Sequence, residues 1–177
     1  MRVQILSPYA ERLLRPIAAA GDIVVDDKPE FIVCYGHRKL IAVPSVPAVN
    51  LHISYLPWNR GADPNCWSWF DDTPKGITIL QIDKGIDTGP VLRQERVAFE
   101  DGHTLASSYW KLREAIEDLF AESWPALRIG MIPAPQRGRG SYHRLSDKEG
   151  YWPLLSDGWN TPVTMVRQMG LREQVVP

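Results

Sequence analysis

The chain has 177 residues, 44% of them hydrophobic and 23% charged, a balance that supports one packed domain and excludes a largely disordered chain. The formal net charge of -1 gives no global attraction to nucleic acid or to an anionic membrane, and the absence of an apolar run of about 18 residues predicts no transmembrane helix. Two cysteines, Cys34 and Cys66, lack metal-ligand spacing, and the N-terminus lacks a signal-peptide pattern. We therefore expect a reduced, cytoplasmic protein without a metal site.

The first part of the chain alternates strand and helix patterns. Short runs rich in Val, Ile and Leu predict strands, and a helical pattern after the first run ends near Gly21. Such alternation is typical of an α/β domain, so we predict a Rossmann-like, mostly parallel twisted sheet flanked by helices. The expected elements are strands at 2–6, 22–27, 30–36 and 48–54 and a helix at 10–21.

The second part contains the clearest helical pattern of the sequence. Apolar residues recur at spacings of three and four over 104–127, with Thr104 as the expected N-cap. Asp63 followed by Pro64 predicts the N-cap of a shorter helix. The remaining expected elements are strands at 76–83 and 91–99 and a short helix at 162–170.

Three polar residues fall near predicted strand ends. A strand that buries Val49 and Leu51 points Asn50 and His52 together to its other face. Asp87 lies in the loop after another strand, and open parallel sheets bind ligands at the carboxyl ends of their strands. If the two strands are neighbours, the three side chains can meet.

This set of side chains has a definite chemistry. An imidazole can move a proton near neutral pH, a carboxylate beside it fixes its orientation, and an amide NH2 can donate to an oxyanion. The set suits attack of an amine on an activated acyl group, and no obvious nucleophile accompanies it, which favours direct transfer. An Asn-x-His pair is more often structural, however, and an Asp before Thr-Gly is more often a turn residue, so spacing alone leaves these alternatives open.

Two sequence blocks resemble a known family. "NLHISYLPWNRG" (50–61) and "GITILQIDKGIDTGPVL" (76–92) are similar to the 10-formyltetrahydrofolate-dependent formyltransferases, which include methionyl-tRNA, glycinamide ribonucleotide and amino-sugar enzymes. The resemblance is best over residues 30–125. The family pattern is matched, in order, by Asn50, His52, Ser54, Leu56, Pro57, Arg60, Gly61, Gly76, Thr78, Asp87 and Gly89.

The resemblance implies a mechanism and a formyl donor. A substrate amine would attack the formyl carbon of 10-formyltetrahydrofolate; Asn50 would stabilise the oxyanion and His52 would assist there and help to move protons. Asp87 would orient His52 or a water and help to relay the amine proton. The pterin would lie between the segments 35–41 and 81–85. The cofactor-binding residues implied in this way are Arg38, Lys39, Leu40, Ile82 and Asp83.

The acceptor is implied by the stretch between the two blocks. "LPWNRGADPNCWSWFDDTPKGITI" is most similar to the branch that formylates amino sugars on nucleotide carriers, so we expect the primary amine of a nucleotide-linked amino sugar. The basic loop 136–149 is a candidate phosphate contact, with a solvated loop as the equal alternative. For Trp67, core packing is at least as strong an expectation. The expected substrate-binding residues are Arg60, Gly61, Trp67 and Tyr142.

The chain also departs from the family pattern. Fewer residues than usual precede Asn50, and "SPYAERLL" replaces the usual Gly-rich turn after the first strand. We expect one catalytic domain in three parts: a trimmed α/β part at 1–49, a catalytic core at 50–128 and a C-terminal extension at 129–177. The C-terminal barrel of the tRNA enzyme has no room, so tRNA is not an expected substrate. A homodimer would fit the family, although the sequence shows no decisive interface stripe.

Two other functions remain open at this point. One is a formyltetrahydrofolate hydrolase, which shares the Asn, His and Asp but usually carries a regulatory domain. The other is a trimmed homologue that binds folate or a sugar nucleotide without turnover. The complete set of Asn50, His52 and Asp87 argues against a mere binding protein.

Overall fold

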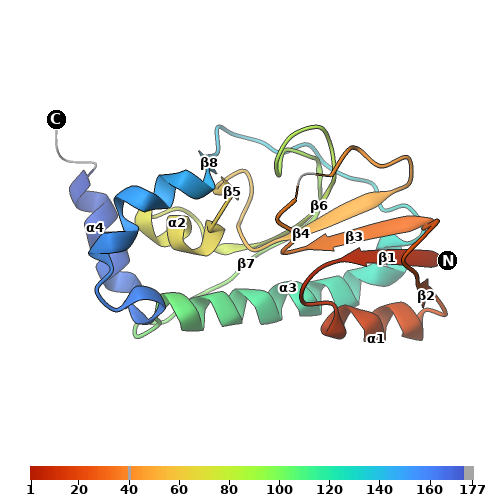
Figure 1. Ribbon diagram of the computed structural model, residues 1–177, viewed down its shortest axis with the longest axis horizontal. Coiled ribbons are helices and arrows are strands. Elements are labelled where there is room, and N and C mark those ends of the chain that lie inside the picture. The colour runs from red at the N-terminus through yellow and green to blue at the C-terminus, as the bar shows by residue number, and fades with distance from the viewer. Residues whose placement is uncertain (40, 174–177) are drawn as a thin grey trace.

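The structure is a computed structural model that describes residues 1–39 and 41–173, and over 171–173 only the backbone is described. A six-stranded sheet in the order β2-β1-β3-β4-β6-β7 forms its centre (Figure 1). Its strands are β1 (Arg2–Leu6), β2 (Ile23–Val24), β3 (Phe31–Tyr35), β4 (Ala48–His52), β6 (Gly76–Gln81) and β7 (Val91–Arg96).

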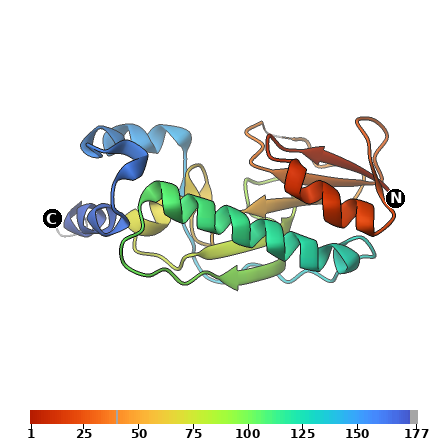
Figure 2. The same ribbon diagram turned by 90° about the horizontal axis from the view of Figure 1, so that it is seen from below.

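The sheet is mostly parallel, as predicted. The first four strands of this order pair in parallel, and β6 runs antiparallel to both β4 and β7. Helices α1 (Glu11–Ala19) and α3 (Leu105–Leu127) lie side by side across one face of the sheet (Figure 2). The predicted Rossmann-like α/β class is confirmed.

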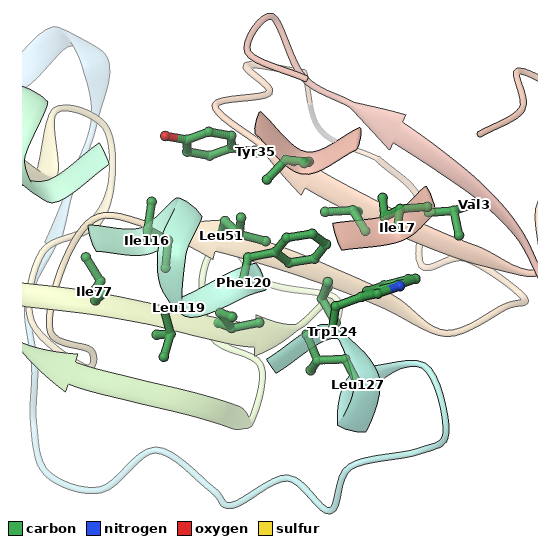
Figure 3. Close-up of a cluster of buried hydrophobic side chains, with 14 of the residues drawn as sticks. Val3, Ile17, Tyr35, Leu51, Ile77, Ile116, Leu119, Phe120, Trp124 and Leu127 are labelled. Carbon is green, nitrogen blue, oxygen red and sulfur yellow. The ribbon is translucent and has the colours of Figure 1, made fainter. Parts of the chain in front are cut away.

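The main hydrophobic core lies between the sheet and these two helices. Alternate residues of β4, Val49 and Leu51, point into it, as do Ile77 and Ile79 of β6. Figure 3 shows the side chains of the strands meeting those of α3, among them the fully buried Phe120. Because β-strand side chains alternate between faces, this burial sends Asn50 and His52 to the opposite side.

A second cluster forms beyond the sheet, where helices α2 (Pro64–Phe70) and α4 (Val163–Glu173) pack together. The short strands β5 (Arg60–Gly61) and β8 (Tyr142–His143) pair in parallel beside them and join the C-terminal segment to the loop after β4. Three 3₁₀ helices complete this region: η1 (Leu145–Gly150), η2 (Trp152–Leu154) and η3 (Gly158–Asn160). Within the described residues, every helix is too short or too polar to cross a bilayer.

The two predicted helix caps have different outcomes. Thr104 caps α3, because its Oγ1 accepts the Ser107 N–H at 3.1 Å and Ser107 Oγ accepts the Thr104 N–H at 2.9 Å. The prediction for Asp63 holds for its position, since Asp63 is the N-cap residue and Pro64 begins α2, but not for the capping interaction. Its backbone is left-handed, with φ of 49°, and its side chain makes no capping hydrogen bond. One Asp63 carboxylate oxygen lies instead 3.3 Å from Lys148 Nζ.

Strand β2 is shorter than the predicted 22–27. The backbone carbonyls of Asp26 and Asp27 accept hydrogen bonds from the Gln4 and Arg2 side chains, each at 2.8 Å, so side chains of β1 replace ladder partners there. The other five strands of the six-stranded sheet each lie within their predicted ranges, whereas the short strands β5 and β8 were not predicted.

A buried carboxylate ties the start of β2 to the end of α3. Asp22, whose side chain is fully buried, accepts hydrogen bonds from Arg128 Nε and Nη2, each at 2.8 Å, and from Trp124 Nε1 at 3.1 Å. The Arg128 hydrogen bonds outweigh desolvation and lower the pKa of Asp22 from 3.8 to about 2. A depressed pKa contributes stability above pH 3.8 that is lost as the pH falls through about 2.

We predict that Asp22→Asn lowers the free energy of unfolding by about 2 kcal/mol at neutral pH, because it removes the charge from a buried carboxylate that accepts two hydrogen bonds from Arg128. The difference from the wild type should shrink as the pH approaches 2, since the wild-type carboxyl then takes up its proton. Urea unfolding at neutral and acidic pH measures both effects. The exposed Asp157→Asn is the matched control, and equal losses in the two variants would contradict the prediction.

Candidate active site

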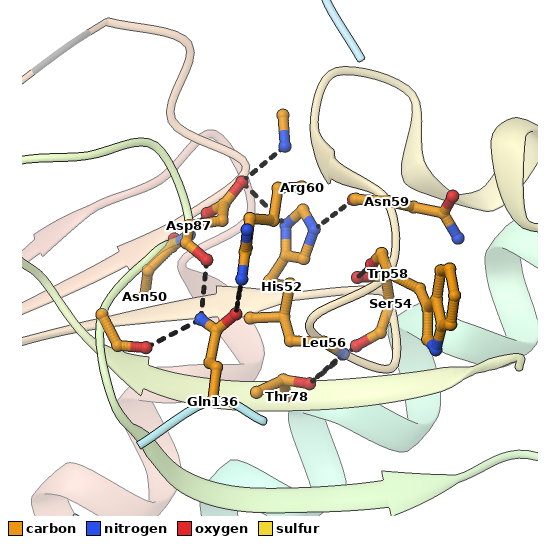
Figure 4. A network of polar contacts seen from close by, with 12 residues as sticks. Asn50, His52, Ser54, Leu56, Trp58, Asn59, Arg60, Thr78, Asp87 and Gln136 are labelled. Carbon is orange, nitrogen blue, oxygen red and sulfur yellow. Dashed lines mark hydrogen bonds and ion pairs between the residues drawn. The ribbon is translucent and has the colours of Figure 1, made fainter. Parts of the chain in front are cut away.

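Asn50, His52 and Asp87 converge at the carboxyl end of β4 (Figure 4). Asn50 Nδ2 donates to Asp87 Oδ1 at 2.8 Å, and His52 Nδ1 lies 3.5 Å from Asp87 Oδ2. The same Oδ2 accepts the Gly61 backbone N–H at 2.9 Å. The structure therefore brings the three predicted catalytic residues into one network, with the Asp87 carboxylate between the amide and the imidazole.

The loop between β6 and β7 carries Asp87 to this position. Asp87 has a left-handed backbone, with φ of 53°, and its side chain is only 9% exposed. At Gly89 a Cβ would collide with the Gln81 carbonyl oxygen. The Asp-x-Gly pattern thus has a packing reason, because the chain must pass against the end of β6 directly after it presents Asp87.

The partners of His52 restrict where its protons lie. Nε2 is 2.9 Å from the Asn59 carbonyl oxygen, which can only accept, so Nε2 carries a hydrogen. In a neutral ring Nδ1 is then unprotonated and faces Asp87, whereas in the charged ring Nδ1 donates to it. The line from Nδ1 to Asp87 Oδ2 is therefore where a proton can be held or moved.

The loop after β4 is fixed by hydrogen bonds that aim the Asn59 carbonyl. Ser54 Oγ donates to the Trp58 carbonyl at 2.8 Å, and Thr78 Oγ1 donates to the Ser54 carbonyl at 2.7 Å. The fully buried Asn59 donates through Nδ2 to Thr73 Oγ1 at 2.7 Å. Ser54 and Thr78 thus support the loop that orients His52.

Arg60, predicted to bind substrate, contacts the protein itself. Its Nε and Nη2 donate to Gln136 Oε1 at 3.0 and 2.7 Å, and Gln136 Nε2 donates to the carbonyls of Asp87 and Gly89, each at 2.8 Å. Arg60 lines neither of the two cavities beside the site. Its guanidinium braces the Asp87 loop through Gln136, a residue that the sequence did not single out because 76 positions separate it from Arg60.

Two cavities meet at the network. The smaller, of about 170 Å³, is lined by four of the predicted cofactor-binding residues, Arg38, Lys39, Ile82 and Asp83. Leu40, the fifth, lies outside the described residues. The larger, of about 480 Å³, is within the usual size range of small-molecule sites. Asn50 and Asp87 line both, so groups bound in the two cavities would meet at these side chains.

The predicted substrate-binding residues divide around the larger cavity. Gly61 and Tyr142 line it. Gly61 has φ of 89°, and a Cβ there would collide with the His143 carbonyl, so a glycine lets β5 and β8 approach. Trp67 does not line it: the ring is 7% exposed and stacks on His143, with 3.9 Å between centroids. Trp67 therefore supports His143, which does line the cavity.

Of the predicted basic loop, His143, Arg144 and Lys148 line the larger cavity, whereas Arg137 and Arg139 do not. Sequence reasoning missed other lining residues because the fold brings them together from separate elements: the loop after β1, β3, α3 and η3. Among them are Tyr9, Tyr35, Tyr109, Arg113 and Trp159.

The cysteines do not offer a nucleophile. Cys34 lines the smaller cavity and Cys66 the larger, and burial raises the pKa of each thiol to about 11. A thiol must ionise to attack, so both are poor nucleophiles near neutral pH. Among the residues that the structure describes, no cluster of three or more His, Cys, Asp or Glu side chains could hold a metal ion.

Comparisons with known proteins agree on one family. Residues 9–123 match the family described as "Formyl transferase". The crystal structure of the formyltransferase PseJ from Anoxybacillus kamchatkensis, in complex with UDP-4,6-dideoxy-4-formamido-L-AltNAc and tetrahydrofolate, is 41% identical, with a TM-score of 0.88. That similarity covers 96% of this chain and 100% of the other.

Curated relatives match over a smaller share of their length. Methionyl-tRNA formyltransferase of Myxococcus xanthus is 36% identical over 138 residues, which are 75% of this chain and 41% of that protein. The corresponding protein of Thermodesulfovibrio yellowstonii is 35% identical over 121 residues, or 64% of this chain and 39% of the relative. This chain thus spans about two fifths of these two proteins.

We predict that Gln136→Leu loosens the Asp87 loop, because it leaves the two loop carbonyls and the Arg60 guanidinium without their partner. The Gly61 N–H, held by Asp87, should then exchange with solvent at least about 10-fold faster. Hydrogen exchange followed by NMR measures this. Gln136→Glu keeps an acceptor for Arg60 and removes only the donation to the loop, so it should have a similar effect.

The exposed Gln168→Leu is the matched control for this substitution. If the Gly61 N–H exchanges at the same rate in both Gln136 variants as in this control, the hydrogen bonds of Gln136 do not hold the Asp87 loop in place.

Proposed function

Because the chain belongs to the formyl transferase family, we propose that it transfers a formyl group from 10-formyltetrahydrofolate to the primary amine of a nucleotide-linked amino sugar. The observation that carries this proposal is the position of the Asp87 carboxylate. It contacts the Asn50 amide and the His52 imidazole on the wall that two cavities share. A donor in one cavity and an acceptor in the other would react there.

Asn50 is suited to the oxyanion. Its NH2 group has two N–H donors, and one of them is bonded to Asp87. The second can donate to the formyl oxygen as the attacking amine converts the formyl carbon to a tetrahedral centre. Because Asp87 already fixes the amide plane, this donor needs no reorientation during the reaction.

Asp87 and His52 are suited to the proton. The new C–N bond leaves a positive charge on the attacking nitrogen, and the bond from the formyl carbon to the folate nitrogen must break. Asp87 Oδ2 can accept the amine proton and share it with His52 Nδ1, 3.5 Å away. The proton then passes to the leaving folate nitrogen, so the products are a formamide and tetrahydrofolate. His52 Nε2 stays bonded to Asn59, which leaves Nδ1 for this transfer.

The smaller cavity suits the folate. Its wall combines the apolar Ile41, Leu80 and Ile82 with the polar Asp83, a mixture that fits a flat ring with hydrogen-bonding edges. PseJ, which shares 41% identity with this chain over its full length, was crystallised with tetrahydrofolate. Arg38, Lys39, Ile82 and Asp83 would hold the donor there.

The choice of a sugar acceptor rests on similarity and charge. PseJ was crystallised with a UDP-linked formamido sugar, and its similarity spans both chains almost completely. The tRNA enzymes match over about two fifths of their length, and the net charge of -1 gives no general attraction to RNA. The cytoplasmic location, the homodimer and the three-part division of the chain remain predictions.

We predict that Asp87→Asn lowers kcat by about 100-fold or more, because an amide cannot take up the amine proton. The side-chain shape is kept, so folding and tetrahydrofolate binding should be unchanged. The exposed Asp101→Asn should behave as the wild type. If Asp87→Asn retained kcat within about threefold of the wild type, Asp87 would have no role in proton transfer.

The acceptor can be identified by tetrahydrofolate release from 10-formyltetrahydrofolate with a panel of UDP- and dTDP-linked amino sugars. We expect release only when a suitable sugar amine is present. Release without any amine would instead show a hydrolase, and release with methionyl-tRNA alone would identify a tRNA enzyme. If the protein binds tetrahydrofolate but forms none from 10-formyltetrahydrofolate under any of these conditions, it is a binding homologue without turnover.

A further inference from the structure

The larger cavity continues beyond the catalytic network, around the carboxyl ends of β3 and β4. Its far wall carries Tyr9, Tyr109, Arg113 and Trp159, which come from the loop after β1, from α3 and from η3. Helix α3 covers the face of the sheet opposite to Asn50 and His52 (Figure 1). The cavity thus has a catalytic end and a second end that the proposed chemistry does not use.

Arg113 is held rigidly at this second end. Its Nε donates to Tyr35 Oη at 3.1 Å, its Nη2 donates to Glu117 Oε1 at 3.0 Å, and its Cζ lies 3.9 Å from the centre of the Tyr9 ring. The side chain is only 13% exposed. A guanidinium has five N–H donors, and these two bonds use two of them, so the others remain available toward the cavity that Arg113 lines.

Arg113 shares its carboxylate partner with a second arginine. Glu117, 5% exposed, also accepts a hydrogen bond from Tyr35 Oη at 2.9 Å, and its Oε2 lies 3.3 Å from Arg12 Nη1. One buried carboxylate therefore pairs with two arginines, and the exposed Glu114 reaches Arg12 only at 3.9 Å. A core ion pair alone would not require a second arginine or place free donors on a cavity wall.

Aromatic rings stand beside the guanidinium. Tyr109 Oη is 3.4 Å from Tyr9 Oη, and the Trp159 ring lies 6.5 Å from the Tyr109 ring with 43% of its surface exposed. Flat apolar faces next to a fixed cation match a nucleoside diphosphate, whose base stacks and whose phosphates accept charge-assisted hydrogen bonds.

We infer that Arg113 binds the diphosphate of the nucleotide-linked substrate and that buried Glu117 is its positioning residue. This inference rests on the proposed function for the class of substrate. The base would lie toward Trp159 and Tyr109, and the sugar would reach from Arg113 to the catalytic end. Because Glu117 and Tyr35 fix the guanidinium before binding, little side-chain entropy is lost when the phosphates arrive.

The test is calorimetric titration with UDP, dTDP and uridine, in which no formyl transfer is needed. We expect Arg113→Met to weaken binding of the preferred nucleotide by about 10-fold or more and to leave uridine binding unchanged. Arg113→Lys keeps the charge beside Glu117 but loses the planar guanidinium. The variant should therefore fold, and its affinity for the nucleotide should still be several-fold lower than that of the wild type. With the full substrate, both variants should raise KM more than they lower kcat.

Arg144→Met, which changes another arginine that lines the same cavity, is the matched comparison. If the nucleotide affinity falls in Arg144→Met but not in the Arg113 variants, the diphosphate lies at Arg144 instead, and the inference is overturned. A wild-type protein that binds neither UDP nor dTDP would also overturn it. Binding that depends on Arg113 without any formyl transfer would leave the inference standing and refute the proposed function.

Discussion

The site depends on one carboxylate that contacts an amide, an imidazole and a backbone N–H. Asp87 Oδ1 holds the Asn50 amide, and Oδ2 faces His52 and accepts the Gly61 N–H. These three groups come from two separate segments of the chain, so the carboxylate ties the two segments together. The carboxylate is itself held in a left-handed turn, a conformation that a non-glycine residue rarely keeps unless its surroundings fix it. Catalytic geometry here is therefore a property of the loops around Asp87 as much as of the three side chains.

The C-terminal segment holds much of the structure around Asp87 in place. Gln136 bridges Arg60 to the Asp87 loop, Ser141 Oγ accepts the Asn59 N–H at 2.8 Å, and β8 pairs with β5. The same segment then supplies Tyr142, His143 and Arg144 to the wall of the larger cavity. One stretch of chain thus braces the loops around Asp87 and lines the larger cavity, so a change in the shape of that cavity and a change in the geometry of the network are physically coupled.

The sequence predicted what depends on local pattern. Alternation placed Val49 and Leu51 in the core and hence Asn50 and His52 on the other face, and helical spacing with Thr104 located α3. What it missed depends on contacts between distant residues. Arg60 pairs with a glutamine 76 positions away, Trp67 stacks behind a histidine of β8, and Asp63 takes a left-handed backbone that prevents capping. Tyr9 and Arg113 line the cavity only because α1 and α3 pack on the same face, which no single segment reveals. Asp87 was first proposed from its place in the loop after a strand, but a turn aspartate has no distinctive local pattern, so the family resemblance was needed to favour it over a turn residue.

The shared wall explains why direct transfer suits this architecture. A covalent acyl-enzyme lets donor and acceptor use one site in turn, at the cost of a reactive nucleophile. In the proposed reaction the donor and the acceptor would occupy two cavities that Asn50 and Asp87 both line, and burial raises the pKa of the nearby thiols, which keeps them protonated. With both molecules bound at once, holding the amine and the formyl carbon together would replace covalent capture as the main source of rate. Affinity at the far end of the larger cavity then contributes to catalysis, because an acceptor anchored by its remote group presents its amine to Asp87 in a restricted orientation.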